Sequence, residues 1–166
     1  MRLSSSLAVV AGGALALGAR AALPHLIARK VRSDLDKLNA GDHRPMLAAY
    51  ADDAILRFPV GDHRWSGEHR GKTAIERFLR EFTAAGLFGE ITELHASGPP
   101  WRMTLLARFD DHALGPRGQR LYDNRAVLLG RLRWGKIVEH EDFFADTGPL
   151  ETLERRLREL DRHPVT

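Results

Sequence analysis

The chain has 166 residues, of which 43% are hydrophobic and 28% charged, with a formal net charge of +3 and no cysteine. This composition is typical of one globular domain with a sizeable core, and it excludes a disordered or collagen-like chain. Without cysteine there are no disulfides, thiolate metal sites or cysteine nucleophiles. The basic residues are scattered among acidic ones, which argues against a nucleic-acid partner.

The first element in chain order is an apolar N-terminal segment over residues 1–23, uncharged from Leu3 to Ala19. Residues 7–19 have the length of a signal-peptide apolar region. A longer span followed by basic residues would instead be a membrane anchor, and a packing helix is the third alternative. We therefore expect a protein that is either membrane-associated through this segment or cytoplasmic.

The main domain is expected over residues 24–148. Pro24 suits the first turn of a helix, and apolar residues then recur at helical spacing until Gly41. A short helix over 45–50 and a strand within "DDAILRFPV" follow. After a glycine-containing polar loop, "KTAIERFLREFTAAG" has the pattern of an amphipathic helix with one apolar face.

Beyond Gly86 the hydrophobic period changes to two, which predicts strands separated by short turns. The predicted strands cover residues 88–96, 101–111, 120–133 and 136–145. A capped amphipathic helix and a tail occupy the C-terminal region 149–166. Helices and one strand followed by an antiparallel meander predict an α+β fold, with helices on one face of a curved sheet.

Four stretches of this domain resemble the NTF2-like superfamily, in particular its SnoaL-like group. These stretches are "LNAGD", "YADDAILRFPVG", "HRGKTAIERFLREF" and "GKIVEHEDFFADT". The group is related to polyketide cyclases, limonene epoxide hydrolases and ketosteroid isomerases. The resemblance implies a cone-shaped barrel, in which a strongly curved, mostly antiparallel sheet wraps around about three helices and encloses one apolar pocket. It implies chemistry without a cofactor, and homodimers as elsewhere in the superfamily.

The resemblance also implies positions for catalytic groups. The base and the two hydrogen-bond donors of ketosteroid isomerases fall on Phe58, on Asp34 and near Val127, which argues against that reaction. Epoxide hydrolases carry Arg-x-Asp on one strand and a second Asp on the last strand. The motif Arg108-Phe109-Asp110 matches the first element and Asp142 the second, whereas Leu56 and Arg57 replace the residues that hold the hydrolytic water.

Strand alternation places Arg108 and Asp110 on one face of their strand, and His140, Asp142 and Phe144 on one face of the last strand. If both faces line the cone, Arg108 lies between two carboxylates, one able to act as a base and the other as an acid. From the residues alone, Arg108 and Asp110 also fit an exposed ion pair worth about 0–1 kcal/mol.

Further side chains are candidates for the pocket wall and for ligand contact. They are Arg57, Trp65, Tyr122, Asn124 and Phe144. Trp101 follows Gly-Pro-Pro and is expected in the core. No histidine spacing typical of zinc sites occurs, and no Walker A, G-x-G-x-x-G or G-x-S-x-G motif, so we expect no metal and no nucleotide chemistry.

Two functions remain open from the sequence. One is binding of a small apolar molecule, with acid/base catalysis by Arg108, Asp110 and Asp142 of the epoxide hydrolase or cyclase kind. The other is a non-catalytic module that binds a ligand passively or forms homodimers and protein contacts through the outer sheet face. The candidate residues of that face are Leu121, Val127 and Leu129, interleaved with Arg125 and Arg131.

Overall fold

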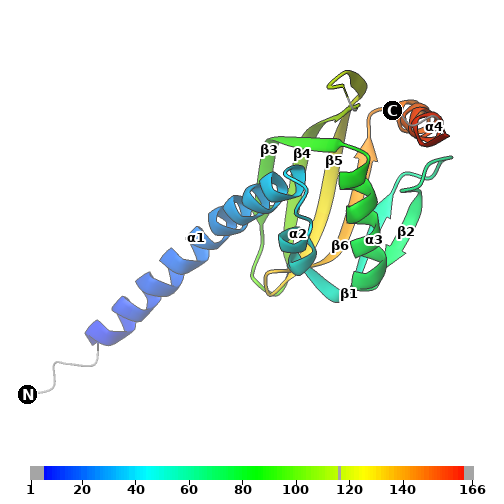
Figure 1. Ribbon diagram of the computed structural model, residues 1–166. Helices are drawn as coiled ribbons and strands as arrows, with labels where there is room; N and C mark the ends of the chain where they lie inside the picture. Colours follow the sequence, from blue (N-terminus) through cyan, green and yellow to red (C-terminus); the bar gives the residue numbers. More distant parts are fainter. Residues whose placement is uncertain (1–5, 116, 163–166) are drawn as a thin grey trace, which may run out of the picture.

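The computed structural model describes residues 6–115 and 117–162, with side-chain surroundings over 22–115 and 117–161 (Figure 1). The helices are α1 (Ser6–Asn39), α2 (Arg44–Ala49), α3 (Gly71–Ala84) and α4 (Gly148–Arg162). The strands are β1 (Tyr50–Phe58), β2 (Gly67–Arg70), β3 (Leu87–Ser97), β4 (Met103–Leu114), β5 (Arg120–Arg133) and β6 (Lys136–Phe144). This is the predicted α+β fold.

The strands form one curved, unclosed sheet in the order β2-β1-β6-β5-β4-β3. Every neighbouring pair is antiparallel except β1 and β6, which run parallel and join the early strand to the last one. The sheet bends around the end of α1, around α2 and around α3, whereas α4 lies at the other end of the domain (Figure 1).

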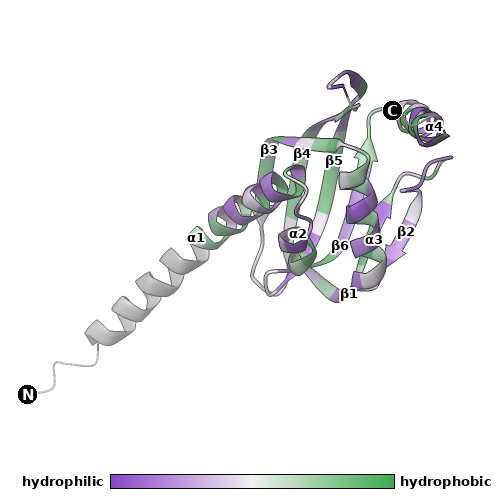
Figure 2. Cartoon of the chain, in the orientation of Figure 1, coloured by the Kyte–Doolittle hydropathy of each residue, from purple (hydrophilic) through white to green (hydrophobic). Residues whose placement is uncertain are grey.

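The core lies between the sheet and these helices, because each element turns one apolar face inward. On α3, Ile75, Phe78 and Leu79 are buried, as their helical spacing predicts. Burial of each such side chain stabilises the fold by about 1.5–3 kcal/mol. Hydrophobic residues follow the strands of the meander, and hydrophilic ones gather on β2 and on the β4–β5 loop (Figure 2).

Helix α1 differs from the sequence prediction. The expected start was Pro24, but the helix begins at Ser6 and Pro24 lies inside it. Proline removes one hydrogen bond of the helix, while the Ala- and Leu-rich residues before it favour helix, so the helix continues through it. Within the described ranges, no helix combines the length and hydrophobicity that a membrane crossing requires. The first five residues of the predicted N-terminal segment lie outside the described part.

The turn between β5 and β6 is tight. Trp134 and Gly135 have φ values of 53° and 78°, the signs required by a two-residue type I′ turn. No other non-glycine residue of the described chain has a positive φ. The Trp134 backbone N–H donates a hydrogen bond of 2.7 Å to the carbonyl oxygen of Pro100, which ties this turn to the β3–β4 loop.

Candidate functional site

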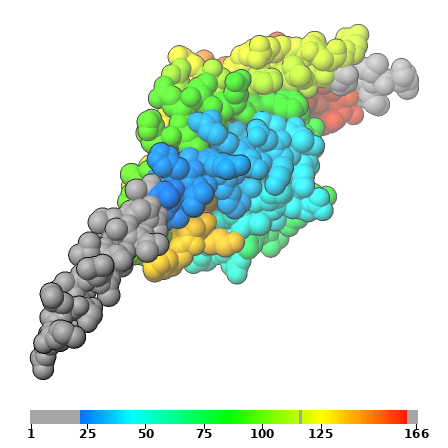
Figure 3. Space-filling model, turned by 90° about the vertical axis from the view of Figure 1, so that its left-hand side faces the viewer, coloured from blue at the N-terminus to red at the C-terminus, as the bar shows by residue number. Residues whose placement is uncertain are grey.

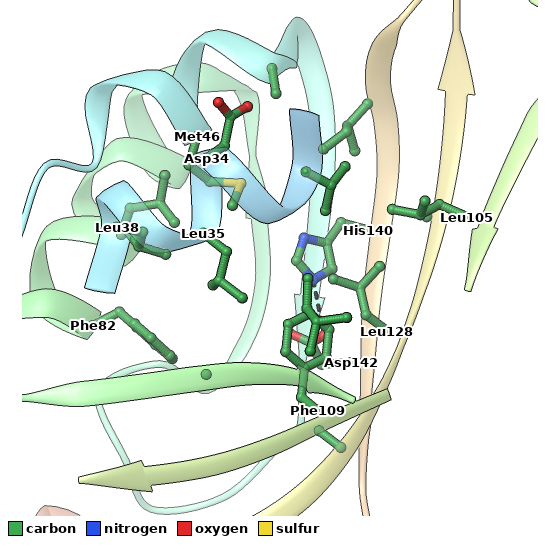
Figure 4. A pocket seen from close by; sticks show the side chains of 18 of the residues that line it. Asp34, Leu35, Leu38, Met46, Phe82, Leu105, Phe109, Leu128, His140 and Asp142 are labelled. Atoms are coloured by element: carbon green, nitrogen blue, oxygen red, sulfur yellow. Dashed lines mark hydrogen bonds and ion pairs between the residues drawn. The ribbon is translucent and has the colours of Figure 1, made fainter. Parts of the chain in front are cut away.

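A cavity of about 100 Å³ lies between the concave face of the sheet and the helices (Figure 4). Helices α1, α2 and α3 supply one wall and strands β1, β3, β4, β5 and β6 the other. Most of the lining is apolar, including Val31, Leu35, Leu38, Met46, Leu79, Phe82, Ile91, Leu105, Phe109, Leu128, Ile137 and Phe144. Such a lining with a few polar groups is typical of a site for a compact, mostly apolar ligand.

Five polar or charged side chains reach this cavity. They are Asp34, Tyr50, Asp111, His140 and Asp142. Asp34 is buried on α1 and forms an ion pair with the exposed Lys30, one helical turn earlier. The other four come from the sheet wall, so the chemically active groups are concentrated on β1, β4 and β6.

Tyr50, His140 and Asp142 form a hydrogen-bonded chain. The Tyr50 hydroxyl lies 2.5 Å from His140 Nδ1, and His140 Nε2 lies 3.0 Å from Asp142 Oδ1. The rings of Tyr50 and His140 are stacked, with 6.0 Å between centroids. His140 and Asp142 share the inner face of β6 because side chains two residues apart point to the same side. The parallel pairing of β1 with β6 brings Tyr50 to them.

Burial and the nearby negative charge of Asp142 raise the pKa of Tyr50 well above its ordinary value. The Tyr50 hydroxyl therefore keeps its proton and donates a hydrogen bond to His140 Nδ1. Because Nδ1 accepts this hydrogen bond, Nε2 carries an N–H that points to Asp142 Oδ1. This arrangement leaves Asp142 as a hydrogen-bond-accepting carboxylate in a largely apolar surrounding.

Asp111 on β4 is the second carboxyl group of the cavity, and its residue is only 8% exposed. Burial is the main cause that raises its pKa, to about 8, and the negative charges of Asp142 and Asp110 add to the effect. Asp111 is therefore a protonated acid at neutral pH. Gly89 faces it from β3, where a Cβ atom would lie 3.2 Å from Asp111 Oδ1, so the glycine leaves room for the carboxyl group.

The prediction that Arg108 and Asp110 line the cavity is wrong. Both are exposed on the outer face of β4, where the Arg108 side chain is 45% exposed and pairs with Glu93 at 3.4 Å. The inner face of β4 carries the other set of alternating residues, Met103, Leu105, Ala107, Phe109, Asp111 and Ala113. The more apolar set faces inward because burying it removes more apolar surface from water.

Asp142 and Phe144 are the two predicted site residues that line the cavity, and Phe144 packs against Phe58 with 5.0 Å between ring centroids. The other four predicted wall residues do not line it. Arg57 pairs with Glu68 at 3.1 Å, and Asn124 donates to the carbonyl oxygen of Asp146. Trp65 and Tyr122 are buried in the core.

Sequence reasoning missed Tyr50, Asp111 and His140. Asp111 stands next to Asp110, so only the apolar character of the neighbouring alternate residues distinguishes the inner carboxylate from the outer one. His140 was placed on the correct face of the last strand, but its partner Tyr50 is 90 residues away in the chain. In the part of the chain that the structure describes, no cluster of three or more His, Asp or Glu side chains could hold a metal ion.

Comparison with solved structures finds the same fold in several proteins. An NTF2-like protein of unknown function from Burkholderia pseudomallei is 23% identical with a TM-score of 0.63, covering 77% of this chain and 96% of its own. An LEH-like epoxide hydrolase from M. tuberculosis is 20% identical with a TM-score of 0.58, covering 86% and 98%. TerC, co-crystallised with polyporic acid, is 19% identical with a TM-score of 0.64, covering 78% and 98%.

At these identities the likeness concerns the fold alone, and it confirms the predicted NTF2-like architecture. Comparison with curated protein sequences found no significant match. The family model of the SnoaL-like domain matches residues 31–140, which include the cavity lining from Val31 to His140, whereas Asp142 and Phe144 lie just beyond the matched residues. Because this match covers well over half of its length, the chain belongs to the SnoaL-like domain family.

Proposed function

We propose that the cavity binds a small, mostly apolar molecule and that Asp142 and Asp111 catalyse cofactor-free acid/base chemistry on it. The observation that supports this proposal best is the presence of two carboxyl groups in one apolar cavity, Asp111 with its pKa raised by burial and Asp142 hydrogen-bonded to His140. Groups whose pKa values are pushed apart provide an acid and a base at the same pH. Here burial raises the pKa of Asp111, and no arginine is among the described residues that line the cavity.

Asp142 is the proposed base. Its Oδ1 accepts the hydrogen bond from His140 Nε2, which fixes the carboxylate in one orientation. His140 is in turn fixed by Tyr50, so both act as positioning residues. A carboxylate held in this way takes a proton from a water molecule or from an acidic C–H of the ligand.

Asp111 is the proposed acid. In epoxide hydrolysis, Asp142 takes a proton from water as the water oxygen attacks a ring carbon. The ring C–O bond breaks, and the Asp111 carboxyl group gives its proton to the departing oxygen. The product is a diol, and transfer of the proton from Asp142 back to Asp111 restores both groups. The likeness in fold to an LEH-like epoxide hydrolase favours this reaction among acid/base reactions.

The experiment measures diol formation from cyclohexene oxide, styrene oxide and limonene oxide. We expect wild type to convert at least one of them, and Asp142→Asn and Asp111→Asn to lower its rate by about 100-fold or more. Asp110→Asn is the matched control, because Asp110 is adjacent to Asp111 but exposed on the outer face. It should keep the wild-type rate.

Two results would contradict this proposal. No conversion by wild type excludes the hydrolysis of these epoxides, and equal losses in the Asp110 and Asp111 variants exclude the assigned acid. Binding is tested separately by the thermal shift that each epoxide causes. Leu128→Trp, which fills the cavity from β5, should abolish that shift. A shift that survives this change places the compounds elsewhere.

A second candidate function is self-association through the outer face of the sheet. Leu106, Val127 and Phe143 are exposed there on three adjacent strands, and Val127 lies directly opposite Phe143 in the β5–β6 register. Contiguous exposed apolar side chains of this kind favour a protein interface. The partner that we propose is a second copy of this chain, in line with the homodimers implied by the family.

A further inference from the structure

Two tryptophans are exposed at one end of the domain. Trp101 in the β3–β4 loop is 54% exposed, and Trp134 in the β5–β6 turn is 68% exposed. Their ring centroids are 6.0 Å apart, and the backbone hydrogen bond from Trp134 to Pro100 holds the two loops together. Trp101 was expected in the core, but it stands on the surface because its loop projects beyond the sheet. The two rings form one aromatic projection on a rigid base.

The backbone at Trp134 is unfavourable for tryptophan. A type I′ turn requires positive φ at both central residues, and Asn, Asp or Gly are preferred there because larger side chains are strained. Trp134 has φ 53° in the first of these positions. Its ring packs on Trp101, which is itself exposed, and not on the buried core. An exposed, strained aromatic residue is therefore better explained by contact with a partner than by folding.

The surroundings of the two rings are basic. A shallow groove of about 590 Å³ beside Trp101 is lined by Arg102, Arg131 and Arg133, with Glu139 as the one acidic residue of its lining. All three arginines are exposed. The groove also has apolar walls from Pro99, Leu132 and Val138. A partner of this surface must therefore present negative charge together with an apolar layer.

The same end of the domain is where α1 leaves it. The β3–β4 loop and the β5–β6 turn lie on the side toward which α1 projects (Figure 1). The space-filling view shows residues of the β5–β6 region, in gold, close to the blue part of α1 (Figure 3). On this part of α1, Leu26, Arg29 and Arg32 are exposed. Apolar and basic side chains of α1 thus add to those of the two loops.

We propose that the tryptophan end, defined as Trp101, Arg102, Arg131, Arg133 and Trp134, binds the surface of an anionic lipid bilayer. Tryptophan is favoured at the membrane–water interface, where the ring contacts the acyl boundary and its N–H stays hydrated. Arginines at the same level pair with lipid phosphates. The two rings contact each other, so they form a wedge suited to insertion between headgroups. This inference is independent of the cavity and its proposed chemistry.

The test uses the full chain with vesicles of POPC, or of equimolar POPC and POPG, containing brominated phosphatidylcholine that quenches inserted tryptophan. Trp65 is fully buried and serves as the internal reference for unquenched emission. We expect wild-type emission to be quenched by the vesicles with POPG. In Trp101→Ser/Trp134→Asn the quenching should disappear and the affinity should fall by about tenfold. Asn at 134 suits the type I′ turn, so the variant keeps its fold.

The charge contribution is tested with Arg102→Gln/Arg131→Gln/Arg133→Gln, which should weaken binding to POPG vesicles by about tenfold and remove its salt dependence. The matched control is Arg77→Gln/Arg80→Gln, which changes two exposed arginines of α3. It should bind like wild type. Absence of quenching in wild type, or equal quenching in wild type and the tryptophan variant, overturns the proposal. Binding through the N-terminal segment alone would give the first of these results, because that segment contains no tryptophan.

Discussion

Asp111 is the residue whose protonation state is most altered by the fold. In the unfolded chain its pKa returns to the ordinary 3.8, whereas in the folded protein it is about 8. Between these values the folded state holds one more proton at this site than the unfolded state. The contribution of Asp111 to the free energy of unfolding therefore falls as pH rises from about 4 to about 8, and it is constant above that.

We expect Asp111→Asn to remove this fall in the free energy of unfolding with rising pH. Its thermal stability should decrease less steeply than that of wild type between pH 5 and pH 8, and it should exceed wild type at pH 8 and above. The measurement is Tm by circular dichroism across this range. Asp110→Asn should stay close to the wild-type curve, because Asp110 is exposed and its charge is the smallest of the three causes that raise the Asp111 pKa. Parallel curves for wild type and Asp111→Asn would show that the carboxyl group is ionised in the folded protein.

At the scale of the element, the β5–β6 turn carries a stability cost. Replacing Trp134 with Asn, a residue that tolerates the left-handed conformation, should stabilise the fold by about 1 kcal/mol, or about 2–4 °C in Tm. Trp101→Asn is the control, since it removes the neighbouring ring without relieving the turn. A fall in Tm for Trp134→Asn would mean that the contact between the rings outweighs the backbone strain.

The helices and strands also show which features can be predicted from the sequence and which cannot. The amphipathic α3 and the strands of the meander were predicted because their apolar spacing is set by the same burial that forms the core. The inner face of β4 was assigned wrongly because polar residues were assumed to face the pocket. In this fold a single buried carboxyl group, Asp111, lies within an otherwise apolar face. Alternation alone cannot identify such an exception.

At the scale of the whole molecule, the outer sheet face is the prediction that remains open. Phe143→Glu introduces a charge directly opposite Val127, among the exposed apolar side chains of β4, β5 and β6. It should convert a dimer to a monomer in light scattering coupled to size exclusion. Val60→Glu is the control, because Val60 is exposed outside the sheet. A wild-type monomer, or a dimer that survives Phe143→Glu, would contradict association through this face.

The cavity and the Tyr50–His140–Asp142 chain depend on contacts that no local pattern contains. The fold class follows from hydrophobic periodicity and from the resemblance to a family, both of which are read along the chain. The partners of His140, however, are set by the curvature of the sheet and by the pairing of its first and last strands. The cavity left between three helices and five strands likewise depends on the sizes of many side chains.

The parallel pairing of β1 with β6 has a consequence for the order of folding. Leu56 pairs with His140, so this contact closes a long stretch of chain, whereas the β3–β4, β4–β5 and β5–β6 pairs are neighbours in sequence. Closure of a longer loop costs more entropy, so we expect the meander to assemble first and β1 to dock afterwards. Because Tyr50 lies on β1, its hydrogen bond to His140 forms only at this last step. A partly folded chain without this bond would have a sheet but no oriented Asp142, so the proposed acid/base activity would report on completed folding.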